Sequence, residues 1–162
     1  MSIHRHHSAG RGGEVWLTPP AVIEALGSFD LDPCAAPPPQ PWPTAARMIA
    51  LPEDGLAAEW RGRVWCNPPY DQIAWAWMDR LADHGQGTAL LFARTETAGF
   101  HAHVWSRASA LRFLAGRLHF HYPDGRRAAA NAGAPSVLVA YGLDDAHRLE
   151  ACGLGGAFVR LR

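Results

Sequence analysis

The chain of 162 residues has no lysine, few cysteines and no long apolar run. Cys34, Cys66 and Cys152 are widely spaced and odd in number, which argues against a disulfide framework and for a reducing compartment. No segment approaches the roughly 20 apolar residues that a membrane-spanning helix needs. The polar, histidine-rich start also lacks the apolar core of a signal peptide. We therefore expect a cytoplasmic protein without a membrane partner.

Net charge is missing as well. Fifteen arginines offset fifteen acidic residues, so no long-range field attracts a nucleic acid or a membrane, and any polyanion site must be local. Every arginine can contact phosphate in a bidentate manner, although codon bias would also explain the absence of lysine. With 48% hydrophobic residues, the chain can bury one core. We expect a flexible tail over residues 1–14 and a single domain over residues 15–162.

Helix-like and strand-like patterns alternate along the chain. Thr18 and the prolines after it predict a capped helix that ends at Gly27, and a second helix ends at Gly85. The second helix should bury one face, made of Ile73, Ala74, Trp77, Met78 and Leu81. Residues 99–109 should also be helical, and the proline-rich residues 35–44 should form a surface loop. Strands are predicted within residues 28–33, 61–67, 88–93, 110–116 and 135–142. This alternation predicts an α/β sandwich built on a mainly parallel sheet.

Polar stretches follow several predicted strands. In parallel sheets, ligands bind beyond the carboxyl ends of the strands. On this interpretation the stretches at those ends are Asp30 with Asp32, residues 67–70, residues 94–97 and the segment after Tyr141. The first three are candidate sites. For the two aspartates, a turn that caps a strand end is an equally good explanation.

The tetrapeptide "NPPY", residues 67–70, suits one kind of chemistry. Pro68 and Pro69 hold the chain in a stiff bend at the end of a strand, which by itself could be a rigid connector. The Asn67 side-chain carbonyl and the Pro68 main-chain carbonyl can both accept hydrogen bonds, and Tyr70 offers a flat face. Two acceptors that grip an exocyclic amine make it more nucleophilic, and an aromatic face holds an unstacked base. The tetrapeptide therefore suits alkylation of an amino group by direct in-line displacement.

"NPPY" resembles the catalytic motif of amino methyltransferases that use S-adenosylmethionine. The segments "VWLTPPAVIEALGSFDLDPCAAP", "DGLAAEWRGRVWCNPPY", "RTETAGF" and "GRLHF" follow one another in an order similar to the phage-type DNA N6-adenine methyltransferase (Dam-like) family. The resemblance covers roughly residues 14–142. It implies a Rossmann-like S-adenosylmethionine-dependent methyltransferase sandwich that methylates the N6 amino group of an adenine flipped out of DNA. The DNA would be a duplex or a single strand, in the host cytoplasm if a phage or prophage encodes the protein.

The resemblance also implies roles for individual residues. Thr18 and Pro19 would lie against the methionine end of the cofactor, and Asp54 would accept a hydrogen bond from the cofactor's adenine, on which Leu56 would pack. The turn under the cofactor would consist of Asp32, Pro33, Cys34 and Ala35. The residues that act on the target base would be Asn67, Pro68 and Tyr70, with Pro69 fixing the bend. The family positions expected to line the base pocket or contact phosphate are Thr95, Phe100 and Arg117.

The chain departs from this pattern around the cofactor. The loop after the first predicted strand, "CAAPPPQP", is poor in glycine, although such loops commonly use glycine to approach a nucleotide. Between Cys34 and Asp54, the single acid is Glu53, so no convincing carboxylate is available for the ribose hydroxyls. Sequence discrimination would depend on short loops, such as residues 117–134, or on a second subunit. We therefore expect low or short-site specificity.

Two alternatives to a DNA methyltransferase stay open. The same tetrapeptide would suit methylation of a protein glutamine or of an RNA base, and the altered loop would suit a non-catalytic DNA-binding relative. Other conspicuous residues favour structural roles. Cys66 and the two helical tryptophans, Trp75 and Trp77, should be core residues. His119 and His121 lack further ligands at a suitable spacing, so we expect no metal. Arg126 and Arg127 are expected to be solvated.

Overall fold

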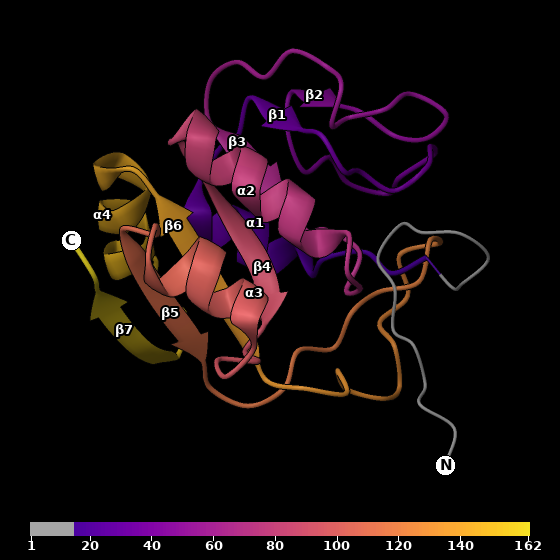
Figure 1. Cartoon of the computed structure of the whole chain (residues 1–162). Coiled ribbons are helices and arrows are strands. Elements are labelled where there is room, and N and C mark those ends of the chain that lie inside the picture. The colour runs from indigo at the N-terminus through magenta and orange to yellow at the C-terminus, as the bar shows by residue number, and fades with distance from the viewer. Residues whose placement is uncertain (1–14) are drawn as a thin grey trace.

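The computed structural model describes residues 15–162, so the predicted tail lies outside the described residues. They form a seven-stranded sheet with helices on both faces (Figure 1). The strands are β1 (Leu31–Asp32), β2 (Arg47–Met48), β3 (Val64–Cys66), β4 (Gly87–Phe92), β5 (Ala110–Leu114), β6 (Ser136–Tyr141) and β7 (Gly156–Arg160). The helices are α1 (Pro20–Leu26), α2 (Ala74–His84), α3 (Ala98–Phe100), the π-helical turn η1 (His101–Trp105) and α4 (Leu143–Ala151). The predicted α/β class is confirmed.

The sheet is mixed. In the order β2-β1-β3-β4-β6-β5-β7, the first four strands are parallel, whereas β6 is antiparallel to both neighbours and β7 is antiparallel to β5. The antiparallel ladders are the longer ones, so the prediction of a mainly parallel sheet is wrong. The reason lies in residues 115–135, which join β5 to β6 without a helix. Antiparallel strands need no helical crossover, so the chain returns beside the strand it has just left.

This topology decides which loops share an edge of the sheet. β5 runs in the same direction as β1, β3 and β4, because β6 between β4 and β5 is antiparallel to both. The turns after these four strands, including residues 115–135, therefore lie at one edge, called here the carboxyl edge. The segment after Tyr141 lies at the opposite edge, so its predicted place among the other polar strand ends is wrong.

Helix α1 begins without a side-chain cap. Pro19 occupies the N-cap position, and Thr18 is buried and bonded elsewhere, so the predicted capping role of Thr18 is wrong. The helix ends as predicted at Gly27, whose φ of 81° favours glycine. Val22 and Leu26 are buried against the sheet. The sequence therefore predicts the bounds of the helix correctly but not the residue at its N-cap.

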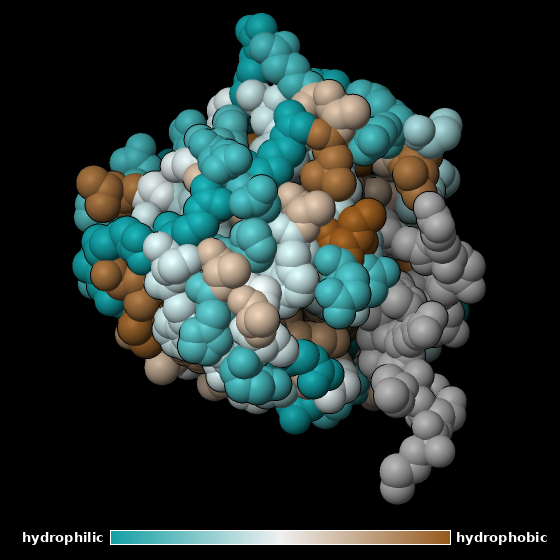
Figure 2. All heavy atoms as spheres, viewed as in Figure 1, coloured by the Kyte–Doolittle hydropathy of each residue, from teal (hydrophilic) through white to brown (hydrophobic). Residues whose placement is uncertain are grey.

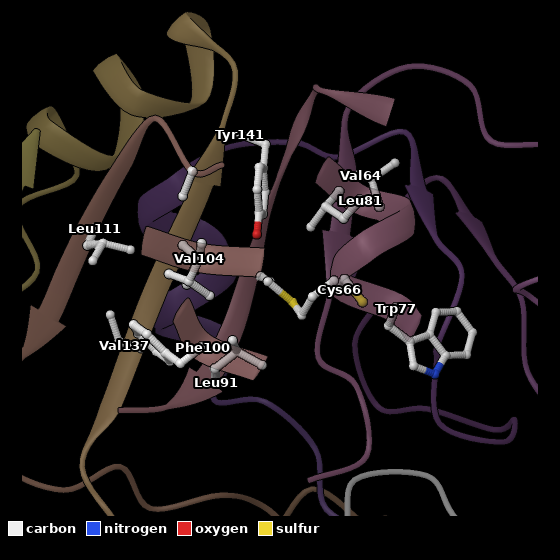
Figure 3. Close-up of a cluster of buried hydrophobic side chains, with 14 of the residues drawn as sticks. Val64, Cys66, Trp77, Leu81, Leu91, Phe100, Val104, Leu111, Val137 and Tyr141 are labelled. Atoms are coloured by element: carbon white, nitrogen blue, oxygen red, sulfur yellow. The ribbon is translucent and has the colours of Figure 1, made fainter. Parts of the chain in front are cut away.

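Helix α2 covers one face of the sheet. Ala74, Trp77, Met78 and Leu81 are buried as predicted, and Gly85 ends the helix in the left-handed conformation. Ile73 is the exception: it precedes the helix and is 48% exposed, so its predicted burial is wrong. Figure 3 shows Trp77 and Leu81 of this helix beside β3, within a core cluster that also contains Val64, Cys66, Leu91, Phe100, Val104, Leu111, Val137 and Tyr141.

A second core cluster lies on the other face of the sheet. Because successive strand residues point to opposite faces, Trp65 of β3 and Leu90 of β4 face away from α2. They pack with α1 and α4 in a cluster that includes Val22, Leu26, Phe29, Leu138, Ala146 and Leu149. β2, α4 and β7 were not predicted from the sequence. Their addition completes a three-layer arrangement of helix, sheet and helix.

The surface seen in Figure 2 is mostly hydrophilic around α2, and its hydrophobic residues form separate small groups. This face offers no large apolar patch of the kind that marks an extensive protein interface. Within the described part of the chain, no helix has the length and apolar character needed to cross a membrane.

Candidate active site

The predicted tetrapeptide lies at the carboxyl edge, directly after β3. The Asn67 side chain is 6% exposed, and its Nδ2 donates a hydrogen bond to Thr18 Oγ1 at 3.1 Å. The Asn67 Oδ1 accepts a hydrogen bond from the Tyr70 hydroxyl at 2.9 Å. Thr18 thus serves to orient Asn67, because it binds the amide nitrogen and leaves the amide oxygen facing Tyr70.

Tyr70 lies against the end of the next strand. Its ring stacks on Phe92, the last residue of β4, with the ring centroids 4.1 Å apart and the planes 24° from parallel. Burial raises the pKa of the Tyr70 phenol, so the hydroxyl stays neutral and can donate to Asn67. The diproline bend therefore places the tyrosine ring against the last residue of the neighbouring strand β4.

A first hollow, open to solvent, adjoins Asn67. The hollow brings together four residues predicted from sequence: Thr18, Asp32, Cys34 and Asn67. Its other lining residues were not predicted as site residues: Trp16, Leu17, Ala36, Gln40, Trp42, Thr44 and Trp65. The proline-rich stretch expected to be a surface loop thus supplies part of a wall.

Asp32 is the charged group of the first hollow. Its carboxylate is 3% exposed and accepts hydrogen bonds from the Thr44 hydroxyl and, at 3.0 Å, from the Cys34 main-chain nitrogen. Burial raises the pKa of the Asp32 carboxyl to about 6, although the two hydrogen bonds oppose this change. A buried carboxylate beside a hollow favours a cationic ligand. The sequence signal for Thr44 was absent because a lone threonine after prolines has no distinctive pattern.

Asp30 does not share this site. It precedes β1, is exposed, and accepts a hydrogen bond from the Arg63 main-chain nitrogen at 2.7 Å through its Oδ2. Asp30 directly precedes β1, whereas Asp32 is the last residue of that strand. Asp30 thus matches the strand-capping explanation and does not line the first hollow.

The segment around Asp54 lies beside the turn after β1. Gly55 comes so close to this turn that a Cβ atom there would lie 1.8 Å from the Pro33 carbonyl oxygen. Asp54 Oδ1 accepts a hydrogen bond from the Leu56 main-chain nitrogen at 2.9 Å, and Leu56 packs partly on the core. The structure thus brings residues 54–56 next to Pro33, as the predicted cofactor roles require. Neither Asp54 nor Leu56 lines the first hollow itself.

Three other predicted cofactor residues contribute through the main chain. The Ala35 nitrogen donates to the Ile49 carbonyl oxygen at 2.9 Å, and the Pro19 carbonyl oxygen accepts from the Val22 nitrogen at 3.0 Å. Pro19, Pro33 and Ala35 do not line the first hollow. They shape the turns that hold its lining residues.

The predicted substrate residues lie in three different settings. Phe100 is fully buried in the core and packs edge to face against Trp105, so it does not line an open base pocket. The Thr95 carbonyl oxygen accepts a hydrogen bond from the Trp105 indole at 3.1 Å. Arg117 is exposed at the carboxyl edge, and its Nη1 donates to the Ala132 carbonyl oxygen at 3.1 Å. Of the three residues, Arg117 is exposed, Thr95 is half-buried and Phe100 is buried.

A second hollow, also open to solvent, is linked to the tetrapeptide through Phe92. Its wall includes Phe92, on which Tyr70 stacks, and Trp16, which also lines the first hollow. The remaining lining residues are Phe120, Ala128, Ala130, Asn131 and Ala132, all from the connection between β5 and β6. Small residues in a loop carry no sequence signal, which explains why this hollow was not predicted.

The cysteines and histidines near the site have structural surroundings. Cys66 is fully buried in the core as predicted, and burial raises the pKa of the Cys34 and Cys66 thiols, so neither is a thiolate nucleophile. The ring nitrogens of His119 and His121 lie 3.1 and 2.9 Å from main-chain carbonyl oxygens of the same connection. Among residues 15–162, no group of three or more histidine, cysteine or acidic side chains is placed to bind a metal.

The site is thus a buried amide that lines a hollow with a carboxylate and bonds to a tyrosine stacked on an aromatic wall of a second hollow. No curated protein and no solved structure matches the chain. The sequence model of one family, described as DNA N-6-adenine-methyltransferase (Dam), matches residues 6–145, which include the tetrapeptide and the residues that line both hollows. A match over this much of the chain confirms the resemblance seen in the sequence, and the chain therefore belongs to the DNA N-6-adenine-methyltransferase family.

Proposed function

We propose that the protein transfers the methyl group of S-adenosylmethionine to the N6 amino group of an adenine flipped out of DNA. One observation carries this proposal: Asn67 lines the first hollow and bonds to Tyr70, whose ring rests on a wall of the second hollow. A methyl donor in the first hollow and a base in the second would therefore meet at the tetrapeptide. Family membership supports the same reaction.

The residues of the first hollow fit S-adenosylmethionine. The buried Asp32 carboxylate suits the positively charged end of the cofactor, and the indole rings of Trp16 and Trp42 suit a sulfonium or an adenine ring. Asp54 and Leu56 lie beside the same turn, where the family resemblance places the cofactor's adenine. When bound, S-adenosylmethionine supplies a methyl group activated for nucleophilic displacement. Thr18, Asp32 and the turn after β1 would hold it.

The second hollow suits a planar base. Its walls are aromatic rings and alanines, and the Asn131 amide makes no hydrogen bond within residues 15–162, so it is available to the edge of a base. Phe92 and Phe120 offer apolar surface to a ring that has left its stack. Tyr70 would then supply the stacking face next to the reacting amine.

The chemistry then belongs to the tetrapeptide. The Asn67 Oδ1 and the Pro68 carbonyl oxygen would accept hydrogen bonds from the adenine amino group, which localises the nitrogen lone pair for attack on the methyl carbon. The Tyr70 hydroxyl, which bonds to Asn67 Oδ1, would release it as the amine arrives. The bound cofactor would supply the methyl carbon to this nitrogen and would keep the bonding electron pair on its sulfur. The proton lost by nitrogen passes to water, because amide oxygens are too weakly basic to keep it.

Methyl transfer from labelled S-adenosylmethionine tests the proposal. We expect label in unmethylated DNA, with N6-methyladenine as the product on nucleoside analysis. Incubation with total RNA and total protein under the same conditions provides the comparison. Label in the protein or RNA fraction alone would show that the substrate is a protein or RNA and not DNA. Cofactor binding measured by calorimetry, without transfer to any fraction, would indicate a non-catalytic relative.

A further inference from the structure

The arginines of the described chain divide into two groups by their partners. Six form ion pairs with acidic side chains: Arg47, Arg61, Arg63, Arg107, Arg126 and Arg160. Three more are engaged by main-chain carbonyl oxygens at other parts of the surface: Arg80, Arg112 and Arg162. Four arginines of residues 15–162 remain: Arg94, Arg117, Arg127 and Arg148. Arg117 has one main-chain carbonyl contact, at the carboxyl edge, and the other three have neither kind of partner.

Three of these four lie next to lining residues of the second hollow, along the chain or by direct contact. Arg94 follows Phe92 by two residues, and the main-chain nitrogen between them, that of Ala93, donates to the Pro135 carbonyl oxygen at 2.8 Å. Arg117 reaches across the β5–β6 connection to Ala132, which lines the hollow. Arg127 directly precedes Ala128, another lining residue. All three arginines are exposed, whereas Arg148 lies at the opposite edge, near Gly27.

The connection that carries two of these arginines is held in place by main-chain bonds. The Ala128 nitrogen donates to the Phe120 carbonyl oxygen at 2.8 Å, and the Ala132 nitrogen donates to the Leu118 carbonyl oxygen at 2.7 Å. Asp124, the acid nearest in sequence to Arg127, is bound by Arg126 at 2.7 Å. Arg127 therefore keeps its charge uncompensated by that carboxylate.

We infer that Arg94, Arg117 and Arg127 contact the DNA phosphates on either side of the adenine that enters the second hollow. This inference rests on the proposed function and names the DNA-contacting surface for it. The chain has no net charge, so attraction to DNA must come from a local excess of positive charge, and these unpaired guanidinium groups provide one. A guanidinium that already lacks an acidic partner loses no ion pair when it binds phosphate in a bidentate manner. Arg127, which the sequence suggested was merely solvated, is thereby assigned a role.

The salt dependence of DNA binding tests the inference. Each phosphate contact adds about 0.9 to the slope of log affinity against log salt concentration on duplex DNA. We expect Arg94→Ala, Arg117→Ala and Arg127→Ala each to reduce the slope by about 0.9, and the triple variant to reduce it by about 2.7. The measurement is a titration of a fluorescein-labelled unmethylated duplex with the full chain at several salt concentrations. Thermal unfolding of each variant verifies that it is folded.

Arg61→Ala is the matched control. Arg61 is exposed, precedes β3 at the opposite edge, and pairs with exposed Glu59, so its removal changes the net charge by the same amount as each single variant without touching the carboxyl edge. A triple variant whose slope equals that of Arg61→Ala would overturn the inference. The triple lysine variant retains the charge, and we expect it to keep most of the slope; a slope as low as that of the alanine variant would also count against phosphate contacts.

Failure of the proposed function is recognised separately. Methyl transfer by the unaltered protein is measured on the same duplex. If the unaltered protein transfers methyl groups and the triple alanine variant keeps its salt slope, the proposed function stands and the arginine assignment is wrong. If the unaltered protein transfers no methyl group but the slope falls as expected, the DNA contacts stand and the catalytic proposal is wrong.

Discussion

Asn67 is held at both ends of its amide, by Thr18 on the nitrogen and by Tyr70 on the oxygen. We expect Asn67→Ala to lower the rate of methyl transfer by about 10- to 100-fold, because a lost hydrogen bond to a reacting group costs roughly 1–3 kcal/mol. The affinity for S-adenosylmethionine should change much less. Single-turnover rates and calorimetry measure the two quantities, and equal losses in both would contradict the assigned role. Asn67→Asp, which keeps an acceptor oxygen, should retain more activity.

Tyr70 combines a hydroxyl that occupies Asn67 with a ring that stacks on Phe92. Tyr70→Phe keeps the ring and removes the hydroxyl that bonds to Asn67 Oδ1, so we expect methyl transfer within a few-fold of the unaltered protein, or faster. Tyr70→Ala removes the stacking face, worth about 1–3 kcal/mol per base, and should weaken productive binding of DNA by about 5- to 150-fold. Steady-state kinetics at varied DNA concentration separates the variants. A phenylalanine variant as impaired as the alanine variant would show that the hydroxyl acts in the reaction.

Asp32 makes stability depend on pH. Its pKa of about 6 in the fold lies above the usual 3.8, so the folded chain holds the proton more tightly than the unfolded chain. The free energy of unfolding should therefore fall as the pH rises from about 4 to 6, by at most ~3 kcal/mol at about 1.4 kcal/mol per pH unit. Urea unfolding across this range measures the change.

Asp32→Asn provides the matching control. An asparagine can keep both hydrogen bonds if the Thr44 hydroxyl turns to accept one, so we expect a more stable protein at pH 7 and a flatter pH profile. The same variant should bind S-adenosylmethionine more weakly, because the negative charge that faces the first hollow is lost. Unchanged pH dependence in this variant would show that another group titrates.

At the scale of helices and strands, the sequence predicts the features that follow from the spacing of apolar residues. The buried face of α2, its end at Gly85, and the strands β1, β3 and β4 follow from local patterns. Strand direction does not, because an apolar run such as residues 136–141 looks the same in a parallel and an antiparallel setting. β7 is mostly exposed and β2 has only two residues, so neither produces a hydrophobic signal.

Helix α4 is joined to the rest of the fold by a buried ion pair. Arg63 Nε donates to Asp145 Oδ1 at 2.8 Å, the Thr88 hydroxyl donates to the same oxygen, and Arg63 Nη1 donates to the carbonyl oxygen of Leu26 at the end of α1. Both charged side chains are less than a tenth exposed. This one cluster therefore ties α1, β3, β4 and α4 together at the edge opposite the site.

Removing one member of this pair should be costly. We expect Asp145→Ala to lower the free energy of unfolding by about 3–5 kcal/mol, because Arg63 would keep its charge in a buried place without a partner. Urea unfolding at pH 7 measures the loss. Glu150→Ala is the comparison: Glu150 pairs with Arg160 on the exposed surface, and such pairs contribute about 0–1 kcal/mol. Similar losses of unfolding free energy in the two variants would show that the buried pair stabilises the fold no more than an exposed pair does.

At the scale of the whole molecule, the site is assembled from segments that are far apart in the chain. The family motifs predicted that Thr18, Asp32, Cys34 and Asn67 belong together, and all four line one hollow. The rest of the walls comes from residues whose local sequence is ordinary, such as the proline-rich stretch and the alanines of the β5–β6 connection. Phe100 shows the opposite case, in which a family position proves to be core. Tertiary contacts, which no local pattern contains, decide these positions.

The indole of Trp16 is a wall common to both hollows, and each hollow is open to solvent. A cofactor in the first hollow and a base in the second would then share no wall except Trp16, so either could leave while the other stays. We expect steady-state inhibition by the demethylated cofactor to follow a random order of addition. Such an order would let the protein exchange its cofactor without leaving the DNA.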